Sequence, residues 1–182
     1  MTFAQHSAAT PEHYTPPDIV NAARALMGGI TLDPATTNSV NAAHVQATHI
    51  FTKADDGLTK TWHGNVFLNP PGGRIKNRSS AAVWWAKLQE QYRMARVEQA
   101  VFVGFSIEIL QTTQGPYWIG HYPFCVPRRR IEFLKQAEGT FVPGESPTHA
   151  NLIAYVPPRY GSWEQHCERF KEAFSQFGMV RT

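Results

Sequence analysis

The chain has 182 residues, enough for one domain with a substantial core and too few for two full-size catalytic domains. Its composition is 42% hydrophobic, 12% aromatic and 17% charged, which is typical of a globular protein and excludes a disordered one. A formal net charge of +3 and a pI near 9.0 favour a polyanionic partner such as nucleic acid. We therefore expect a single globular domain over residues 1–182.

Cysteine usage and hydropathy indicate the compartment. Cys125 and Cys167 lie far apart and belong to no CxxC pair, so neither a disulfide framework nor a zinc site with cysteine ligands is predicted. Residues 1–9 lack the basic flank and apolar stretch of a signal peptide, and no window of about 18 apolar residues occurs in the chain. We expect a soluble, cytoplasmic protein without membrane contact.

The first predicted elements are a helix and a short strand that leads to an acidic turn. Residues 15–17 open the helix, because threonine can cap it and proline suits its first turn, and apolar residues recur at helical spacing up to residue 27. Two glycines then end it. The apolar run 30–32 predicts a buried strand, and this strand carries Asp33 and Pro34 at its carboxyl end.

A second strand leads to a stiff turn. Residues 34–64 are small and polar with weak periodicity, which predicts only short helical pieces and loops. The apolar run 65–68 predicts the strand, and the chain leaves it through Asn69-Pro70-Pro71 and two glycines, where regular structure cannot continue. The Asn-Pro-Pro turn, residues 69–71, is therefore expected at the end of a strand.

The rest of the chain alternates helices with apolar strands. Helices are predicted over 80–97, over 106–113 and from a capping box at 162–165, and strands over 100–103, 122–126 and 151–156. This alternation indicates an α/β domain with a central, mostly parallel sheet. We expect residues 1–12 to be flexible and, by elimination, residues 111–147 to be a target-recognition insertion.

The Asn-Pro-Pro turn is suited to holding an amine. Ligands of open α/β sheets bind outside the carboxyl ends of the strands, where both Asp33 and Asn69 are expected. Proline fixes its own backbone angle and restricts its predecessor, so the turn presents the Asn69 side-chain oxygen and the Pro70 carbonyl together. These two acceptors can take both hydrogens of an exocyclic base amine and favour a lone pair aimed at a methyl donor. Taken alone, such a tripeptide is more often an ordinary turn.

Metal and nucleophilic chemistry are not indicated. Asp55 and Asp56 have no further spaced acidic ligands for calcium or magnesium, and the eight histidines show neither HxxxH nor HxH spacing. Ser106 and Cys125 have no base pattern beside them. We expect no metal.

Basic side chains form two clusters that are candidates for contact with DNA phosphate, with a solvated surface as the alternative for each. The first cluster follows the Asn-Pro-Pro turn and the second is an uninterrupted run: Arg74, Lys76 and Arg78, then Arg128, Arg129 and Arg130. We expect the two clusters to flank one groove.

Five short segments, taken in order, are similar to the phage-type Dam family of DNA adenine methyltransferases. They are Tyr14-Thr15-Pro16-Pro17-Asp18, Leu32-Asp33-Pro34-Ala35-Thr36, Asp55-Asp56-Gly57-Leu58, Trp62 and Phe67-Leu68-Asn69-Pro70-Pro71. The similarity covers residues 13–90 and, more loosely, 128–133 and 151–156. It implies a Rossmann-like methyltransferase fold that uses S-adenosylmethionine to methylate the 6-amino group of adenine in double-stranded DNA, in a bacterial or phage-infected cell.

The resemblance also implies roles for individual residues. Those expected at the methionine end of the cofactor are Tyr14, Thr15, Pro16, Asp33 and Pro34. Asp55 or Asp56 is expected at its adenosine, and the catalytic residues are Asn69, Pro70 and Pro71.

Gly72 departs from the family pattern, which has tyrosine or phenylalanine there to stack on the flipped base. Either another ring serves, with Trp84, Trp85 and Phe105 as candidates, or activity is weakened, or the chain is a silent DNA-binding relative. Cytosine 4-amine, RNA and a protein glutamine amide are alternative targets for the same turn, and the basic clusters favour nucleic acid. The sequence indicates neither a target site nor an oligomeric state.

Overall fold

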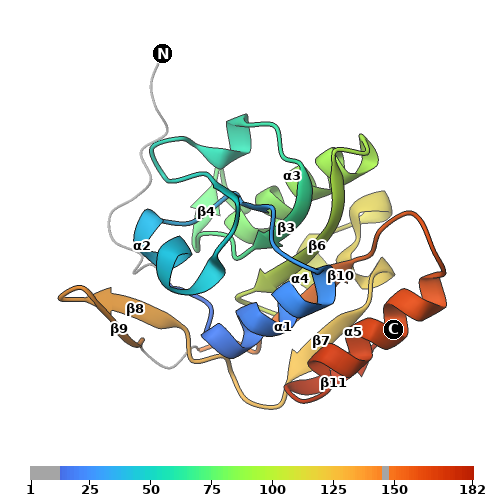
Figure 1. Ribbon diagram of the computed structural model, residues 1–182. Coiled ribbons are helices and arrows are strands. Elements are labelled where there is room, and N and C mark those ends of the chain that lie inside the picture. Colours follow the sequence, from blue (N-terminus) through green and yellow to red (C-terminus); the bar gives the residue numbers. More distant parts are fainter. Residues whose placement is uncertain (1–12, 145–147) are drawn as a thin grey trace.

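The computed structural model describes residues 13–144 and 148–182, so the predicted flexible segment 1–12 lies outside the described residues. The described part is an α/β fold around a mostly parallel, seven-stranded sheet (Figure 1). From edge to edge the strands are β11 (Gly178–Arg181), β7 (Phe124–Pro127), β10 (Leu152–Val156), β6 (Val97–Gly104), β3 (Gly64–Leu68), β1 (Leu32–Asp33) and β2 (His49–Ile50). The prediction of an α/β domain with such a sheet is confirmed.

Strand direction determines which loops meet at one edge of the sheet. β2, β1, β3 and β6 are parallel to one another. β10 is antiparallel to β6, and β7 is antiparallel to β10, so β7 runs in the same direction as β6. We call the edge where β1, β3, β6 and β7 end the carboxyl edge.

Three helices cover the two faces of the sheet. They are α1 (Pro17–Met27), α3 (Ser80–Arg93) and α5 (Trp163–Phe174). Side chains alternate along β6, so that Val101 and Val103 belong to the core cluster under α1 and α5, whereas Phe102 belongs to the cluster under α3. The chain thus buries apolar surface on both faces, as parallel strands require.

Short helices and two hairpins complete the described part. The short helices are α2 (Asn38–Val40), the π-helix η1 (Asn41–Val45), η2 (Gly57–Thr59), α4 (Ile109–Thr112), η3 (Gly115–Tyr117) and η4 (Ile119–His121). The hairpins pair β4 (Arg74–Ile75) with β5 (Arg78–Ser79) and β8 (Leu134–Ala137) with β9 (Thr140–Pro143). Because β4 follows β3 and β8 follows β7, both hairpins leave the carboxyl edge, and β8–β9 projects from the body in Figure 1.

Some helix ends agree with the predictions and others do not. The helix predicted over 106–113 is shorter than expected, because α4 covers only Ile109–Thr112. α5 begins as expected, because the Ser162 side chain accepts a hydrogen bond from the Gln165 amide at 3.4 Å. α1 ends at a left-handed Gly28, but the predicted capping role of Thr15 is wrong: its N-cap is Pro16, and no side chain in the described part caps it. α3 ends at Arg93 rather than residue 97, because Ala95 has φ +57 and cannot continue a helix.

The predicted insertion 111–147 is partly integral to the sheet. It contains β7, which pairs with both β10 and β11, and it includes residues 145–147, which lie outside the described residues. The β8–β9 hairpin of this segment forms a two-stranded sheet separate from the main sheet. Within the described ranges, no helix has the length and apolar character needed to cross a membrane.

Candidate functional site

Asp33 and Asn69 lie where the order of strands reverses. The chain passes from β1 to β2 on one side, and then returns to form β3 on the other side of β1. Ligands of doubly wound sheets bind outside the carboxyl ends of the strands at such a switch point. Asp33 is the last residue of β1, and Asn69 directly follows β3. The structure therefore brings these two predicted site residues to neighbouring strand ends.

The Asn69 side chain is held in a defined orientation. Its Nδ2 donates a hydrogen bond of 2.7 Å to the backbone carbonyl of His13, 56 residues earlier in the chain. The amide nitrogen is thereby occupied, and Oδ1 receives no hydrogen bond from any residue that the structure describes. Asn69 is half-buried, and Pro70 after it is buried. The turn thus presents Oδ1 as an acceptor with a fixed direction.

The segment that holds Asn69 also carries the predicted methionine-end residues. Tyr14 pairs with Leu134 through two backbone hydrogen bonds of 2.8 Å, and its ring packs edge-on against Phe141 at 5.8 Å. Thr15 is only 4% exposed, yet its hydroxyl has no hydrogen-bond partner within residues 13–144 and 148–182. Buried hydroxyls are nearly always satisfied, so this one is suited to a polar group of a ligand.

Asp33 is a buried carboxylate with no ion-pair partner among the residues that the structure describes. It is 3% exposed, it accepts a hydrogen bond of 3.0 Å from the Ala35 amide, and it bonds the Thr36 side chain. The two ion pairs found among the described residues involve other groups. Desolvation by burial outweighs these hydrogen bonds and raises the pKa of Asp33 to about 7. A positively charged ligand group would stabilise its ionised form.

The two predicted adenosine contacts lie in the exposed loop after β2. The Asp55 carboxylate accepts hydrogen bonds from the Thr52 hydroxyl at 2.7 Å and from the Thr52 amide at 2.8 Å, and these lower its pKa. Asp56 is exposed with φ +53, and in the described part its side chain has no hydrogen bond. Asp55 therefore shapes the loop, while the Asp56 carboxylate is left available.

Gly57 brings this loop into contact with the turn after β1. A Cβ at Gly57 would overlap the carbonyl oxygen of Pro34, and the Trp84 ring closes the remaining space. Only glycine permits this approach of two backbones. The two segments predicted to bind the two ends of the cofactor therefore touch each other directly.

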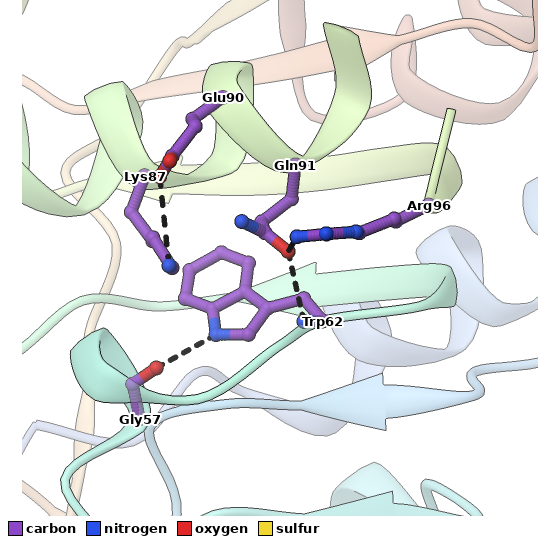
Figure 2. Close-up of polar contacts among 6 residues, drawn as sticks. All are labelled: Gly57, Trp62, Lys87, Glu90, Gln91 and Arg96. Carbon is purple, nitrogen blue, oxygen red and sulfur yellow. Dashed lines mark hydrogen bonds and ion pairs between the residues drawn. The ribbon is translucent and has the colours of Figure 1, made fainter. Parts of the chain in front are cut away.

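Trp62 fastens the same loop to α3, as Figure 2 shows. Its Nε1 donates to the Gly57 carbonyl at 2.8 Å, and its backbone amide donates to Gln91 Oε1 at 3.2 Å. Arg96 donates to the same Gln91 oxygen at 3.3 Å, and Lys87 pairs with Glu90 nearby on α3. The sequence placed Trp62 in a motif but carried no signal for this supporting role.

The two basic clusters lie on two loops of the carboxyl edge. Arg74, Lys76 and Arg78 are exposed on the β4–β5 hairpin, and the arginine run, Arg128, Arg129 and Arg130, is exposed after β7. The arginine run lines a groove of about 610 Å³ together with Pro16, Ile19 and Phe177. Two strands separate β3 from β7, which puts their ends about 14 Å apart. Asn69 and Phe105 lie within this span.

The structure contradicts two of the three candidates for base stacking. Trp84 is 5% exposed and stacks on Trp62, and Trp85 is fully buried, with its Nε1 bonded to the Tyr117 carbonyl at 2.6 Å. Both rings belong to the core and present no face to a base. Gly72 is exposed, and no described atom lies within 4 Å of where its Cβ would be. Phe105 remains, half-buried at the end of β6.

The described residues contain neither a metal-ligand cluster nor an activated cysteine. No group of three or more His, Cys, Asp or Glu side chains gathers among residues 13–144 and 148–182. Both cysteines are buried there without a disulfide, and burial raises the pKa of Cys125 to about 11. A thiol with such a pKa is a poor nucleophile at neutral pH.

Comparison with protein-family models and with curated protein sequences finds no match to this chain.

Proposed function

We propose that this chain transfers a methyl group from S-adenosylmethionine to an exocyclic amine of a base in double-stranded DNA. The leading candidate for this amine is the 6-amino group of adenine. The observation that carries the proposal is the hydrogen bond from Asn69 to the His13 carbonyl, which fixes the amide beside the Asp33 turn at the switch point. An amine acceptor and a buried carboxylate thus share one strand-end site.

The Asn-Pro-Pro turn explains how an unreactive amine is used. The lone pair of a base amine is delocalised into the ring, which makes the nitrogen a poor nucleophile. Asn69 Oδ1 and the Pro70 carbonyl accept its two hydrogens and favour a tetrahedral nitrogen. The new N–C bond forms as the methyl–sulfur bond breaks, and one amine hydrogen leaves as a proton to water. Preorganised acceptors of this kind need no rearrangement during the reaction.

The residues around Asp33 fit S-adenosylmethionine. When bound, this cofactor supplies an electrophilic methyl group and carries positive charge on its sulfonium and amino groups. The Asp33 carboxylate has no protein cation in the described part, and the Thr15 hydroxyl beside the site has no partner there. The ammonium group at the methionine end of the cofactor would pair with the Asp33 carboxylate. The carboxylate at the same end would accept a hydrogen bond from the Thr15 hydroxyl. The exposed Asp56 carboxylate is suited to the ribose hydroxyls.

The carboxyl edge supports DNA as the substrate. Basic side chains project from the β4–β5 hairpin that follows Asn69 and from the loop after β7. Phosphate contacts of this kind fix the position of a duplex without reading its sequence. A base must leave the duplex to reach Asn69, because the amine is otherwise paired inside the helix.

A transfer assay tests the proposal. Purified protein is incubated with unmethylated DNA and methyl-labelled S-adenosylmethionine, and the DNA is digested to nucleosides. Label in 6-methyladenine supports the proposal, whereas label in 4-methylcytosine moves the target to cytosine. Binding of the cofactor without transfer on varied DNA identifies a silent relative, the alternative that Gly72 motivates.

Two asparagine variants sharpen the assay. We expect Asn69→Ala to lower the transfer rate at least about 100-fold, because one of two preorganised acceptors is lost. Its affinity for S-adenosylmethionine should stay close to that of the wild type. Asn21→Ala, exposed on α1, is the matched control and should remain fully active. Full activity of Asn69→Ala would show that the catalytic assignment is wrong.

A further inference from the structure

Phe105 lies beside Asn69 although it comes 36 positions later in the sequence. Asn69 follows β3 and Phe105 follows β6, and the register of these parallel neighbours pairs Leu68 with Phe102. Strand spacing and rise then put the two Cα atoms about 8 Å apart. His13 connects them, because its carbonyl accepts the Asn69 bond while its ring lies 5.4 Å from the Phe105 ring.

Three rings lie near Phe105 among the residues that the structure describes. Phe105, His13 and Phe133 form a nearly equilateral triangle, with centroid separations of 5.4, 5.7 and 6.0 Å. The His13 and Phe133 rings are each tilted by about 31–32° to the Phe105 ring. His149 meets the ring edge-on at 6.0 Å. Phe133 is buried, whereas Phe105 is only half-buried and keeps contact with solvent.

The backbone at Phe105 is held firmly. The buried Asn151 side chain donates through Nδ2 to the Phe105 carbonyl at 2.8 Å and accepts from the Ile131 amide at 2.7 Å. The Ile107 amide donates to the Ala150 carbonyl at 2.8 Å. Asn151 thereby joins the end of β6 to the segment that follows the arginine run, and the ring position is fixed relative to both.

We propose that Phe105 is the aromatic face on which the target base stacks, in place of a ring after the Asn-Pro-Pro turn. This inference rests on the proposed function, since it assigns a second contact to the same base. The base lies with one face on Phe105 and its amine at Asn69 Oδ1. Gly72 is then free of this role, which agrees with its exposed position and empty surroundings in the described part.

Base stacking can be measured apart from catalysis. The probes are a short oligodeoxyadenylate and an abasic strand of the same length, and binding is followed by fluorescence anisotropy. Phe105→Leu keeps the apolar packing but removes the ring. Phe124→Leu is the matched control, because Phe124 is also half-buried but begins β7 at the opposite edge of the sheet. Phe105→Trp keeps an aromatic face, and melting curves check that each variant is folded.

We expect Phe105→Leu to weaken binding of the oligodeoxyadenylate about 10- to 100-fold and to leave the abasic strand unaffected. Phe124→Leu should bind both strands as the wild type does, and Phe105→Trp should retain the preference for bases. On duplex DNA, Phe105→Leu should lower kcat/KM for DNA by a similar factor while the Kd for S-adenosylmethionine stays unchanged.

The outcomes separate this inference from the proposed function. If the wild type methylates DNA and Phe105→Leu behaves like Phe124→Leu, the stacking role is overturned and the activity stands. If the wild type methylates nothing but Phe105→Leu selectively loses oligodeoxyadenylate binding, the activity is overturned and the base site stands. If neither transfer nor selective loss is seen, both are overturned.

Discussion

In the ligand-free protein, the buried Asp33 carboxyl lowers the free energy of unfolding increasingly as the pH rises. Its pKa is about 7 in the fold against 3.8 for an ordinary aspartate, because burial penalises the charge. A group whose folded pKa is raised binds its proton more tightly in the folded state than in the unfolded state. Its contribution to stability is fully present below pH 3.8 and is lost as the pH rises through 7.

The variant Asp33→Asn isolates this cost. At pH 8 we expect it to be more stable than the wild type by about 4 kcal/mol, since each pKa unit corresponds to about 1.4 kcal/mol. At pH 4 the two proteins should differ little, because the wild-type carboxyl is then largely protonated in the fold. Urea denaturation at both pH values measures the difference. A variant less stable than the wild type at pH 8 would contradict the cause assigned to the shift.

The Thr15 hydroxyl also lowers stability, because it is buried and has no hydrogen-bond partner among the described residues. A buried hydroxyl without a partner costs about 1–3 kcal/mol, and valine has nearly the same shape without the hydroxyl. We expect Thr15→Val to unfold at the same or a higher temperature than the wild type and to bind S-adenosylmethionine about tenfold more weakly. Thermal melting and calorimetric titration measure the two effects. Unchanged cofactor affinity would remove Thr15 from the site.

Among the elements, the loop after β2 and the turn after β1 behave as one unit. Gly57 lies against the Pro34 carbonyl, and Trp62 ties the Gly57 carbonyl to α3. Neither contact uses a charged group, so the unit depends on shape. Its geometry should therefore be sensitive to a single methyl group and insensitive to salt.

Gly57→Ala tests this unit. The added methyl group meets backbone rather than a movable side chain, so we expect a loss of about 1–3 kcal/mol in unfolding free energy and weaker cofactor binding. Gly72→Ala is the control, because open space surrounds that position among the described residues, and its stability should change by less than about 0.5 kcal/mol. Equal stability of the two variants would show that the loop yields to the methyl group.

Elements with local signals were predicted from the sequence, and elements fixed by distant partners were not. The end of α1 at Gly28 and the start of α5 at Ser162 follow from residue types within one turn. β2 has only two residues and is defined by its pairing with β1. The end of α3 depends on the left-handed conformation of Ala95, which alanine as a residue type does not predict. Long-range pairing of this kind leaves no periodicity to detect.

The candidate site shows the same division. The strand ends that carry Asp33 and Asn69 follow from apolar runs and turn residues, so their proximity was predicted. The bond from Asn69 to the His13 carbonyl and the approach of Gly57 to Pro34 join segments far apart in the chain. No local pattern encodes them, and the same is true of Phe105, whose place beside Asn69 depends on the register of two strands.

For the whole molecule, charge on two separate loops predicts how DNA binding responds to salt. Each phosphate contact that is lost should reduce the slope of log K against log salt by about 0.9. We expect replacement of the arginine run by alanine to reduce the magnitude of this slope by about 2–3. The affinity for DNA should fall by a similar factor for all DNA sequences. Arg159→Ala is the control, because Arg159 follows β10 at the opposite edge and stacks on Tyr92. An unchanged slope would place the arginine run outside the interface.

The backbone bridge between Tyr14 and Leu134 has a consequence for how two ligands sense each other. The same two hydrogen bonds connect the segment that orients Asn69 to the hairpin that follows the arginine run. A ligand that orders either partner lowers the entropy cost of ordering the other. The proposed function therefore predicts that S-adenosylmethionine and DNA each raise the affinity for the other by the same factor. On the same proposal, a variant that lacks the Tyr14–Leu134 bridge should bind S-adenosylmethionine and DNA independently of each other.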